Sequence, residues 1–177
     1  MLIMAFQSNV FLKSGLSVPG ELYADDPKRA QSYILQSSDP AFNIVGATAY
    51  TVSFEGIAAA GDPTAGAGPV FAGFLVLPKS YALFGAVGGQ PLDPTLVLPN
   101  ETQADLLSMG SIVVTLPAPA QIGDVVFYSQ VDGSLITQPQ GLGVPPGYNY
   151  ANAFVSYYEV TAPGLAVITV NPTEINV

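Results

Sequence analysis

Apolar residues occur along this chain in short blocks that are separated by Gly, Pro and small polar residues. The clearest block is residues 111–116, Ser-Ile-Val-Val-Thr-Leu, which is rich in β-branched side chains and is ended by a proline. Residues 125–128 and 134–137 are two further extended blocks, and Asp132-Gly133 lies between them. Such blocks separated by turn residues predict consecutive antiparallel strands, here a β-meander with a two-residue turn at Asp132-Gly133.

Several other segments have the same character. In residues 42–55 bulky side chains alternate with small ones, so the bulky ones would share one face of a strand, with a bulge or close backbone approach at Gly46. The remaining predicted strands are residues 32–35, two short strands within 70–84, and a hairpin of residues 154–160 and 165–170 around Ala162-Pro163-Gly164.

Residues 100–110 allow two interpretations. Asn100 is a suitable helix N-cap, Gln103 follows three residues later, and Gly110 could end the helix. An extended segment over residues 104–109 that leads into the next strand is the alternative, and the pattern does not choose between them.

The predicted fold is all-β, a small antiparallel β-barrel or sandwich with an extended N-terminal arm and at most one short helix. Residues 1–40 are expected to form the arm. Residues 56–69, rich in Gly and Ala, are expected to be a loop. This divides the chain into an arm with the first strands, residues 1–56, and a β-domain, residues 57–177.

Charged residues are scarce in this chain, which bears on what its surface can do. Only 10% of the 177 residues are charged, although a quarter is usual, while 49% are hydrophobic. Because charge normally keeps a free monomer soluble, a surface with so little of it is expected to lie against partners.

The net charge of −9 is unevenly distributed. All four basic residues lie in the first 79 positions, and seven of the thirteen acidic residues lie in residues 80–177. A chain without a basic face is not expected to bind nucleic acid or an anionic membrane. The first residues lack the charged and long apolar regions of a secretory signal, so synthesis in a cytoplasm is expected.

Most catalytic and metal-binding chemistry is excluded by composition. The chain has no His and no Cys, which removes the usual nucleophile–base pairs and zinc sites. Asp132-Gly133-Ser134 has the wrong order for an aspartic protease motif, and Asp25-Asp26 lacks the spacing of a calcium loop. We therefore expect no catalytic residue, no metal and no cofactor.

Charged residues near the N-terminus are candidates for contacts with a partner. Asp25, Asp26, Lys28 and Arg29 form a compact group that could make intermolecular ion pairs, although a solvated turn with a local salt bridge is an equal alternative. The predicted partner-binding residues of the arm are Lys13, Glu21, Asp25, Asp26, Lys28 and Arg29.

Tyrosines gather near the C-terminus. Tyr148 and Tyr150 are expected in a loop, where they would act as interface aromatics, whereas one of Tyr157 and Tyr158 is expected in the core.

Short motifs throughout the chain resemble the structural cement (head decoration) proteins of tailed bacteriophages. These motifs are Gly20-Glu21, Pro27-Lys28-Arg29-Ala30, Asn43-Ile44-Val45-Gly46-Ala47, Leu98-Pro99-Asn100, Leu107-Ser108-Met109-Gly110, Ile122-Gly123-Asp124-Val125-Val126 and Asp132-Gly133. The resemblance implies a small β-rich domain with an extended arm, which binds the outside of an assembled capsid and staples neighbouring coat subunits. It implies no catalytic residues.

The resulting hypothesis is a non-enzymatic capsid cement protein that binds the major capsid protein on the surface of the virion. The expected oligomer is a homotrimer, with a dimer as second choice. The main alternative is a carbohydrate-binding or adhesin-like β-module that uses Tyr148, Asn149 and Tyr150, and a carboxylate-based hydrolase is the third.

Overall fold

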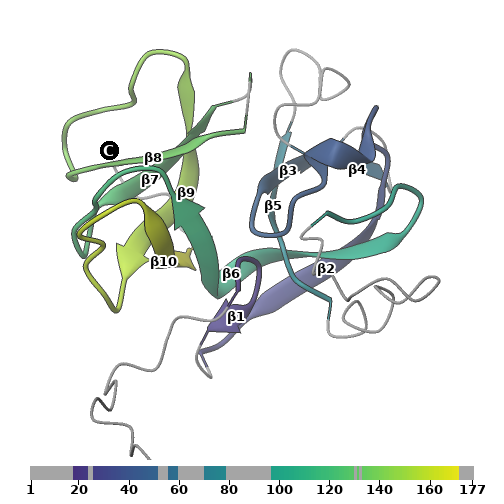
Figure 1. The fold of residues 1–177 in the computed structure, drawn as a ribbon, viewed down its shortest axis with the longest axis horizontal. Helices are drawn as coiled ribbons and strands as arrows, with labels where there is room; N and C mark the ends of the chain where they lie inside the picture. The colour runs from purple at the N-terminus through teal and green to yellow at the C-terminus, as the bar shows by residue number, and fades with distance from the viewer. Residues whose placement is uncertain are drawn as a thin grey trace, which may run out of the picture.

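The computed structural model describes residues 18–23, 26–51, 56–59, 70–78, 97–129, 131 and 133–171. Within them the chain forms ten strands and one 3-10 helix (Figure 1). The first elements are β1 (Leu22–Tyr23), β2 (Arg29–Leu35), η1 (Pro40–Phe42), β3 (Thr48–Thr51), β4 (Gly56–Ala59) and β5 (Val70–Leu75). They are followed by β6 (Gln103–Leu116), β7 (Val125–Ser129), β8 (Leu135–Gln138), β9 (Tyr148–Ser156) and β10 (Gly164–Val170). The predicted all-β, largely antiparallel fold is confirmed.

The long strand β6 joins two groups of strands, which lie on either side of it in Figure 1. Residues 103–109 pair with β2 and, at two positions, with β5; residues 110–116 pair with β10. Gly110 lies between the two halves with a φ of +120°, and a Cβ there would be 3.0 Å from the Lys28 Cβ. The extended alternative for residues 100–110 is therefore the observed one, because strands on both sides pair with this segment.

The first group, which we call the sheet A lobe, consists of residues 110–116 of β6 followed by β10, β9, β7 and β8. The C-terminal hairpin of β9 and β10 is confirmed, and so is the antiparallel pairing of β7 with β8. The predicted meander is wrong at one step, because β6 pairs with β10 and not with β7. The connection between β7 and β8 is also longer than two residues, because β7 ends at Ser129 and β8 begins at Leu135. Ser129 N donates to Ser134 O at 2.9 Å. Asp132 lies outside the described residues.

The second group, the sheet B lobe, follows the order β2-β4-β3-β5-β6, and a further pairing joins β2 back to β6. All these pairings are antiparallel except that of β2 with β4. Residues 56–59 were predicted as loop, but they form β4, in which Ile57 is fully buried. The proposed division of the chain between residues 56 and 57 stays a prediction, and β3 and β4 pair across it.

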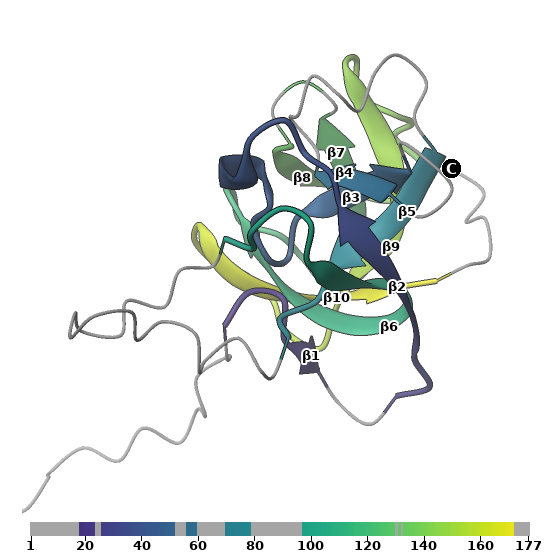
Figure 2. The same ribbon diagram turned by 90° about the vertical axis from the view of Figure 1, so that its right-hand side faces the viewer.

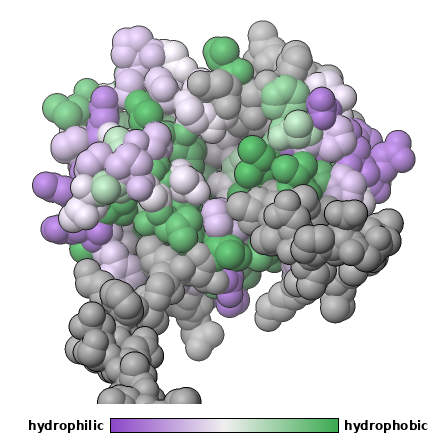
Figure 3. Space-filling model, in the orientation of Figure 1, coloured by the Kyte–Doolittle hydropathy of each residue, from purple (hydrophilic) through white to green (hydrophobic). Residues whose placement is uncertain are grey.

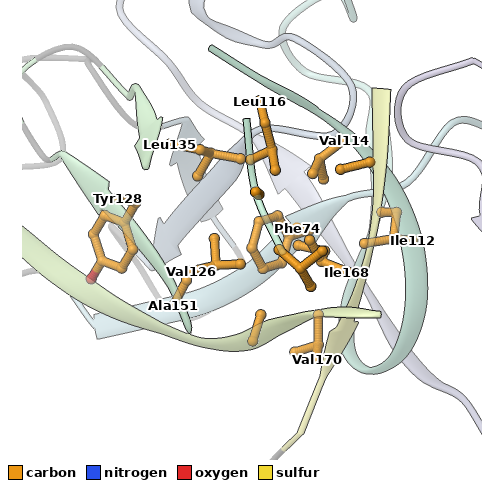
Figure 4. Packing of buried hydrophobic residues seen from close by; sticks show 14 of the residues in the cluster. Phe74, Ile112, Val114, Leu116, Val126, Tyr128, Leu135, Ala151, Ile168 and Val170 are labelled. Carbon is orange, nitrogen blue, oxygen red and sulfur yellow. The ribbon is translucent and has the colours of Figure 1, made fainter. Parts of the chain in front are cut away.

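Each lobe has its own apolar cluster, and β6 contributes side chains to both of them. The sheet B cluster includes Leu35, Ile57, Leu75 and Leu106. The larger sheet A cluster also receives Phe74 from β5, which lies among side chains of the other sheet such as Val126 and Ile168 (Figure 4). The two lobes therefore share packing as well as a strand.

The N-terminal segment belongs to the fold from residue 18 onward. Residues 1–40 were expected to be an extended arm with one strand-like stretch at 32–35. Instead β1 pairs with β6 (Figure 2), and β2 begins at Arg29 and pairs with β6 over six positions. The reason is non-local pairing with β6, which the local sequence does not reveal. The arm remains an expectation only for residues 1–17, which lie outside the described residues, as do Lys13 and Asp25.

Candidate functional site

Three tyrosines and one carboxylate come together where the N-terminal segment meets the turn between β9 and β10. We call Tyr23, Tyr157, Tyr158 and Asp26 the tyrosine cluster. The ring centroid of Tyr23 is 5.1 Å from that of Tyr157 and 6.1 Å from that of Tyr158, both in edge-to-face geometry, which aromatic rings prefer. Tyr157 and Tyr158 are 44% and 48% exposed, so the cluster is a surface feature and the predicted core placement of one of them is wrong.

Hydrogen bonds hold this cluster together. The hydroxyl groups of Tyr23 and Tyr158 lie 2.7 Å apart. The Tyr157 hydroxyl donates to Asp26 Oδ2 at 2.5 Å, and the Ser111 hydroxyl donates to the same oxygen at 2.8 Å. These two donors, the Tyr157 hydroxyl first and then that of Ser111, hold the pKa of Asp26 below its ordinary value. Conversely, its bond to Asp26 raises the pKa of Tyr157.

A row of hydroxyl groups on sheet A lies beneath the cluster. Ser111 Oγ on β6 is 3.0 Å from Thr169 Oγ1 on β10, and Thr169 Oγ1 donates to Ser156 Oγ on β9 at 2.8 Å. Ser111 and Ser156 are buried, and Asp26 adds its carboxylate at the end of the row. Buried polar groups that are all hydrogen-bonded stabilise one arrangement, so this row helps to fix the position of Asp26 on the sheet.

The backbone at Tyr157 has an uncommon conformation. Its φ is +66°, and the amide of Tyr158 donates to the carbonyl of Ser156 at 2.8 Å, which closes a three-residue turn. Turns of this kind with a positive central φ are rare and strained, and a bulky residue at positive φ costs roughly 1–3 kcal/mol. This turn places the two consecutive tyrosines, Tyr157 and Tyr158, at the surface beside Tyr23 and Asp26.

Main-chain contacts hold the N-terminal segment against both lobes. The amide of Gly20 donates to the Val113 carbonyl at 2.8 Å, and the amide of Leu77 donates to the Gly20 carbonyl at 2.8 Å. Gly20 has a φ of +82°, and a Cβ there would lie 2.8 Å from the Val45 Cβ and 3.1 Å from the Gly46 amide. Only glycine fits this close approach. The close approach predicted at Gly46 is thus confirmed, with Gly20 as its partner.

Of the charged group near the N-terminus, Asp26, Lys28 and Arg29 lie in the described residues, whereas Asp25 does not. Asp26 bonds to hydroxyl groups, and among the described residues it forms no ion pair with Lys28 or Arg29. The Arg29 Nε donates to Ser108 Oγ at 3.0 Å across the β2–β6 pair. The Glu21 main chain pairs with Val113. A contact of Glu21, Asp26, Lys28 and Arg29 with a partner stays a prediction.

The two predicted interface aromatics lie in β9 and not in a loop. Tyr148 and Tyr150 are half-buried, and the Tyr150 ring packs 5.9 Å from that of Phe127. The Tyr150 hydroxyl is buried without a hydrogen-bond partner, and burial raises its pKa. Their role at an interface stays a prediction.

Sequence reasoning missed Tyr23, Ser111 and Thr169, and it assigned one of Tyr157 and Tyr158 to the core. One signal was present: an adjacent pair of tyrosines cannot place both side chains on the inner face of a strand. No sequence signal connects Asp26 with Ser111 and Tyr157, because these residues are far apart in the chain and meet only through the strand pairings.

Two further observations limit what the described residues can do. They contain no group of three or more acidic side chains close enough to hold a metal ion. None of the helical structure in the same part of the chain is long and apolar enough to cross a membrane.

The space-filling view shows hydrophobic residues reaching the surface in several patches among hydrophilic ones (Figure 3).

Comparison with known proteins decides the family. The profile of the family described as "Structural cement protein (E217 gp24/Pam3 gp6)" matches residues 6–171, nearly the whole chain. The chain belongs to this family of structural cement proteins. The resemblance found in the sequence motifs is thereby confirmed, and this cement protein has a structural role in capsid cementing or decoration.

A solved structure shares the fold of the cement protein. A chain in "The capsid of Myoviridae Phage XM1" is 19% identical in sequence, with a TM-score of 0.61. The match covers 95% of the cement protein and 98% of the other chain. A search of curated proteins finds no match.

Proposed function

We propose that this cement protein binds the outer surface of a phage head and stabilises contacts between major capsid protein subunits. The family match across the entire described fold is the observation that carries this proposal. The composition supports it, because a chain with only 10% charged residues presents a surface suited to a large contact area. Many copies that each make modest contacts on symmetric sites would together stabilise a head strongly.

The proposed contact surface has two parts. One is the exposed tyrosine cluster, since tyrosine is enriched among the residues that dominate binding energy at interfaces. The other is residues 1–17 with the neighbouring charged residues Glu21, Lys28 and Arg29. The described part of the chain is held to the body at Gly20 through its bonds to Val113 and Leu77.

Proposed partners and location follow from the same role. The partner is the major capsid protein, and the protein is made in the host cytoplasm and resides on the virion. We propose that copies associate as trimers, with dimers as the alternative.

Co-sedimentation with phage heads assembled without the cement protein tests this proposal. The full chain should sediment with the heads and raise the temperature at which they lose their contents. Absence of both effects would overturn the proposed function.

Deletion of residues 1–17 tests the arm, and it leaves β1 and β2 in place, unlike a deletion of residues 1–40. Weaker binding by a deletion variant that unfolds at the same temperature as the full chain supports the arm, and unchanged binding refutes it. Tyr148→Ala tests the interface role of β9 in the same assay: unchanged binding refutes that role.

A further inference from the structure

Within the described residues, the carboxylate of the tyrosine cluster forms no ion pair. Both of its hydrogen bonds come from neutral hydroxyl groups and end on Oδ2, and within the described residues none ends on Oδ1. Lys28 is two residues away, yet its charge is the smallest of the causes that lower the pKa of Asp26. Of the other basic residues, Arg29 donates to Ser108 Oγ, and Lys13 and Lys79 lie outside the described residues. Residues 80–177 contain neither Lys nor Arg.

The surroundings of this carboxylate suit a particular cation. Tyr157 and Tyr158 are nearly half exposed, and their rings belong to the same hydrogen-bonded cluster as Asp26. Tyrosine faces attract cations, and a carboxylate accepts paired hydrogen bonds from a planar guanidinium. Arg is more weakly hydrated than Lys and stacks on aromatic rings, so a guanidinium fits better than an ammonium.

The cluster is also preorganised. Tyr23 holds Tyr158 through the hydroxyl contact, Ser111 holds Asp26, and the turn at Tyr157 fixes the direction of both exposed rings. A site whose side chains are already ordered loses little conformational entropy when a ligand binds.

We propose that the tyrosine cluster is a receptor for an arginine side chain of a neighbouring capsid subunit, with the guanidinium against the exposed tyrosine rings and its charge paired with Asp26. This inference rests on the proposed function for the identity of the partner. The net charge of −9 favours a basic partner group, and the pairing gives the acidic protein a specific point of contact on the coat.

Binding of a small probe tests the receptor without capsids. The full chain is titrated with N-acetyl-L-argininamide at constant ionic strength, and the ring-proton NMR signals of Tyr23, Tyr157 and Tyr158 are followed. The neutral isostere N-acetyl-L-citrullinamide is the matched control. We expect saturable shifts with the arginine derivative and none with the citrulline derivative. Equal responses to both, or a response only to a neutral oligosaccharide, would overturn the proposal.

Variants test the same receptor on phage heads. Asp26→Asn keeps an oxygen for Ser111 and Tyr157 but removes the charge, and we expect it to weaken binding by about three- to tenfold per site. Asp105→Asn is the matched control, because it removes the same charge from a carboxylate that also accepts a serine hydroxyl, in the sheet B lobe.

Tyr158→Ala and Tyr158→Phe form a second pair. The alanine variant loses the exposed ring and should bind less well, whereas the phenylalanine variant keeps the ring and should retain most of the binding. The proposed arginine receptor would be overturned if the Asp26→Asn and Tyr158→Ala variants both bind the heads as well as the wild type. If the wild-type protein does not bind the heads, the proposed function is refuted. The titration with the arginine derivative would still show whether the tyrosine cluster binds a guanidinium.

Discussion

The two lobes on β6 differ in how they use their side chains. In the sheet B lobe close backbone packing dominates: a Cβ on Gly73 would lie 2.5 Å from the Leu107 carbonyl oxygen, and Gly20 meets Gly46 where this lobe joins β6. In the sheet A lobe the turn after β9 presents Tyr157 and Tyr158 to solvent, and Asp26 and Tyr23 are held there by hydroxyl groups. Both lobes thus hold the N-terminal segment, and the sheet A lobe alone displays the aromatic surface beside it.

This difference indicates how a chain with so few charges could build the proposed binding surface. Both lobes contribute position, because the Gly20 amide donates to Val113 of the sheet A lobe and the Gly20 carbonyl accepts from Leu77, which follows β5 of the sheet B lobe. The sheet A lobe contributes the exposed rings. The surface therefore requires both lobes, even though most of its atoms belong to only one of them.

Phe74→Ala should have the largest effect on the coupling between the lobes. Phe74 is fully buried on β5 of the sheet B lobe, but it packs in the sheet A cluster. Its truncation removes a large side chain and leaves a cavity, so the free energy of unfolding should fall by about 3–5 kcal/mol. Denaturant unfolding should still show a single transition. Two separate transitions in the wild type would mean that the lobes fold independently, as a division at residue 56 would allow.

Gly20→Ala should have the next largest effect. Alanine at φ +82° costs about 1–2 kcal/mol in backbone strain, and the contact with Val45 at 2.8 Å adds a clash. Gly147→Ala is the matched control, because Gly147 has the same φ of +82° with nothing within 4 Å. The difference between the two unfolding free energies isolates the close approach. Equal losses would show that the approach at Gly20 contributes nothing.

Tyr157→Phe should weaken the attachment of Asp26 in a pH-dependent way. The folded pKa of Asp26 is lowered, so its bonds contribute stability above the unfolded pKa of an Asp, and this contribution is lost as the pH falls through the lowered pKa. The folded pKa of Tyr157 is raised, so the same bond is lost again as the pH rises through that value.

Carboxyl carbon NMR titration of Asp26 measures the first of these effects. Removal of the Tyr157 hydroxyl should move the pKa of Asp26 up toward its ordinary value. An unchanged pKa of Asp26 in the phenylalanine variant would contradict the hydrogen bond from the Tyr157 hydroxyl to Asp26.

Tyr150→Phe should have the smallest effect. The Tyr150 hydroxyl is buried without a partner, so its removal should change the free energy of unfolding by less than about 1 kcal/mol or stabilise the protein slightly. Thermal unfolding measures this change. A clear loss of stability would mean that the hydroxyl has a bonding partner in solution.

The sequence predicts the parts of the fold that depend on neighbouring residues. The β9–β10 hairpin could be expected because Pro163-Gly164 interrupts two apolar runs, and the strand at 111–116 because its residues are β-branched. The pairing of β2 with β6 could not be predicted, since nothing in Arg29–Leu35 identifies a partner seventy residues away. For the same reason the tyrosine cluster could not be predicted, because Asp26 and Tyr157 come together only through the pairing of their segments with the sheet.

A cryo-electron microscopy reconstruction of heads decorated with the full chain would show which face of the cement protein contacts the coat. We predict that the face carrying Tyr23, Tyr157, Tyr158 and Asp26 lies against the coat, with a basic coat side chain in contact with the Asp26 carboxylate. A reconstruction in which this face points to solvent, while other surfaces of the bound protein contact the coat, would contradict it.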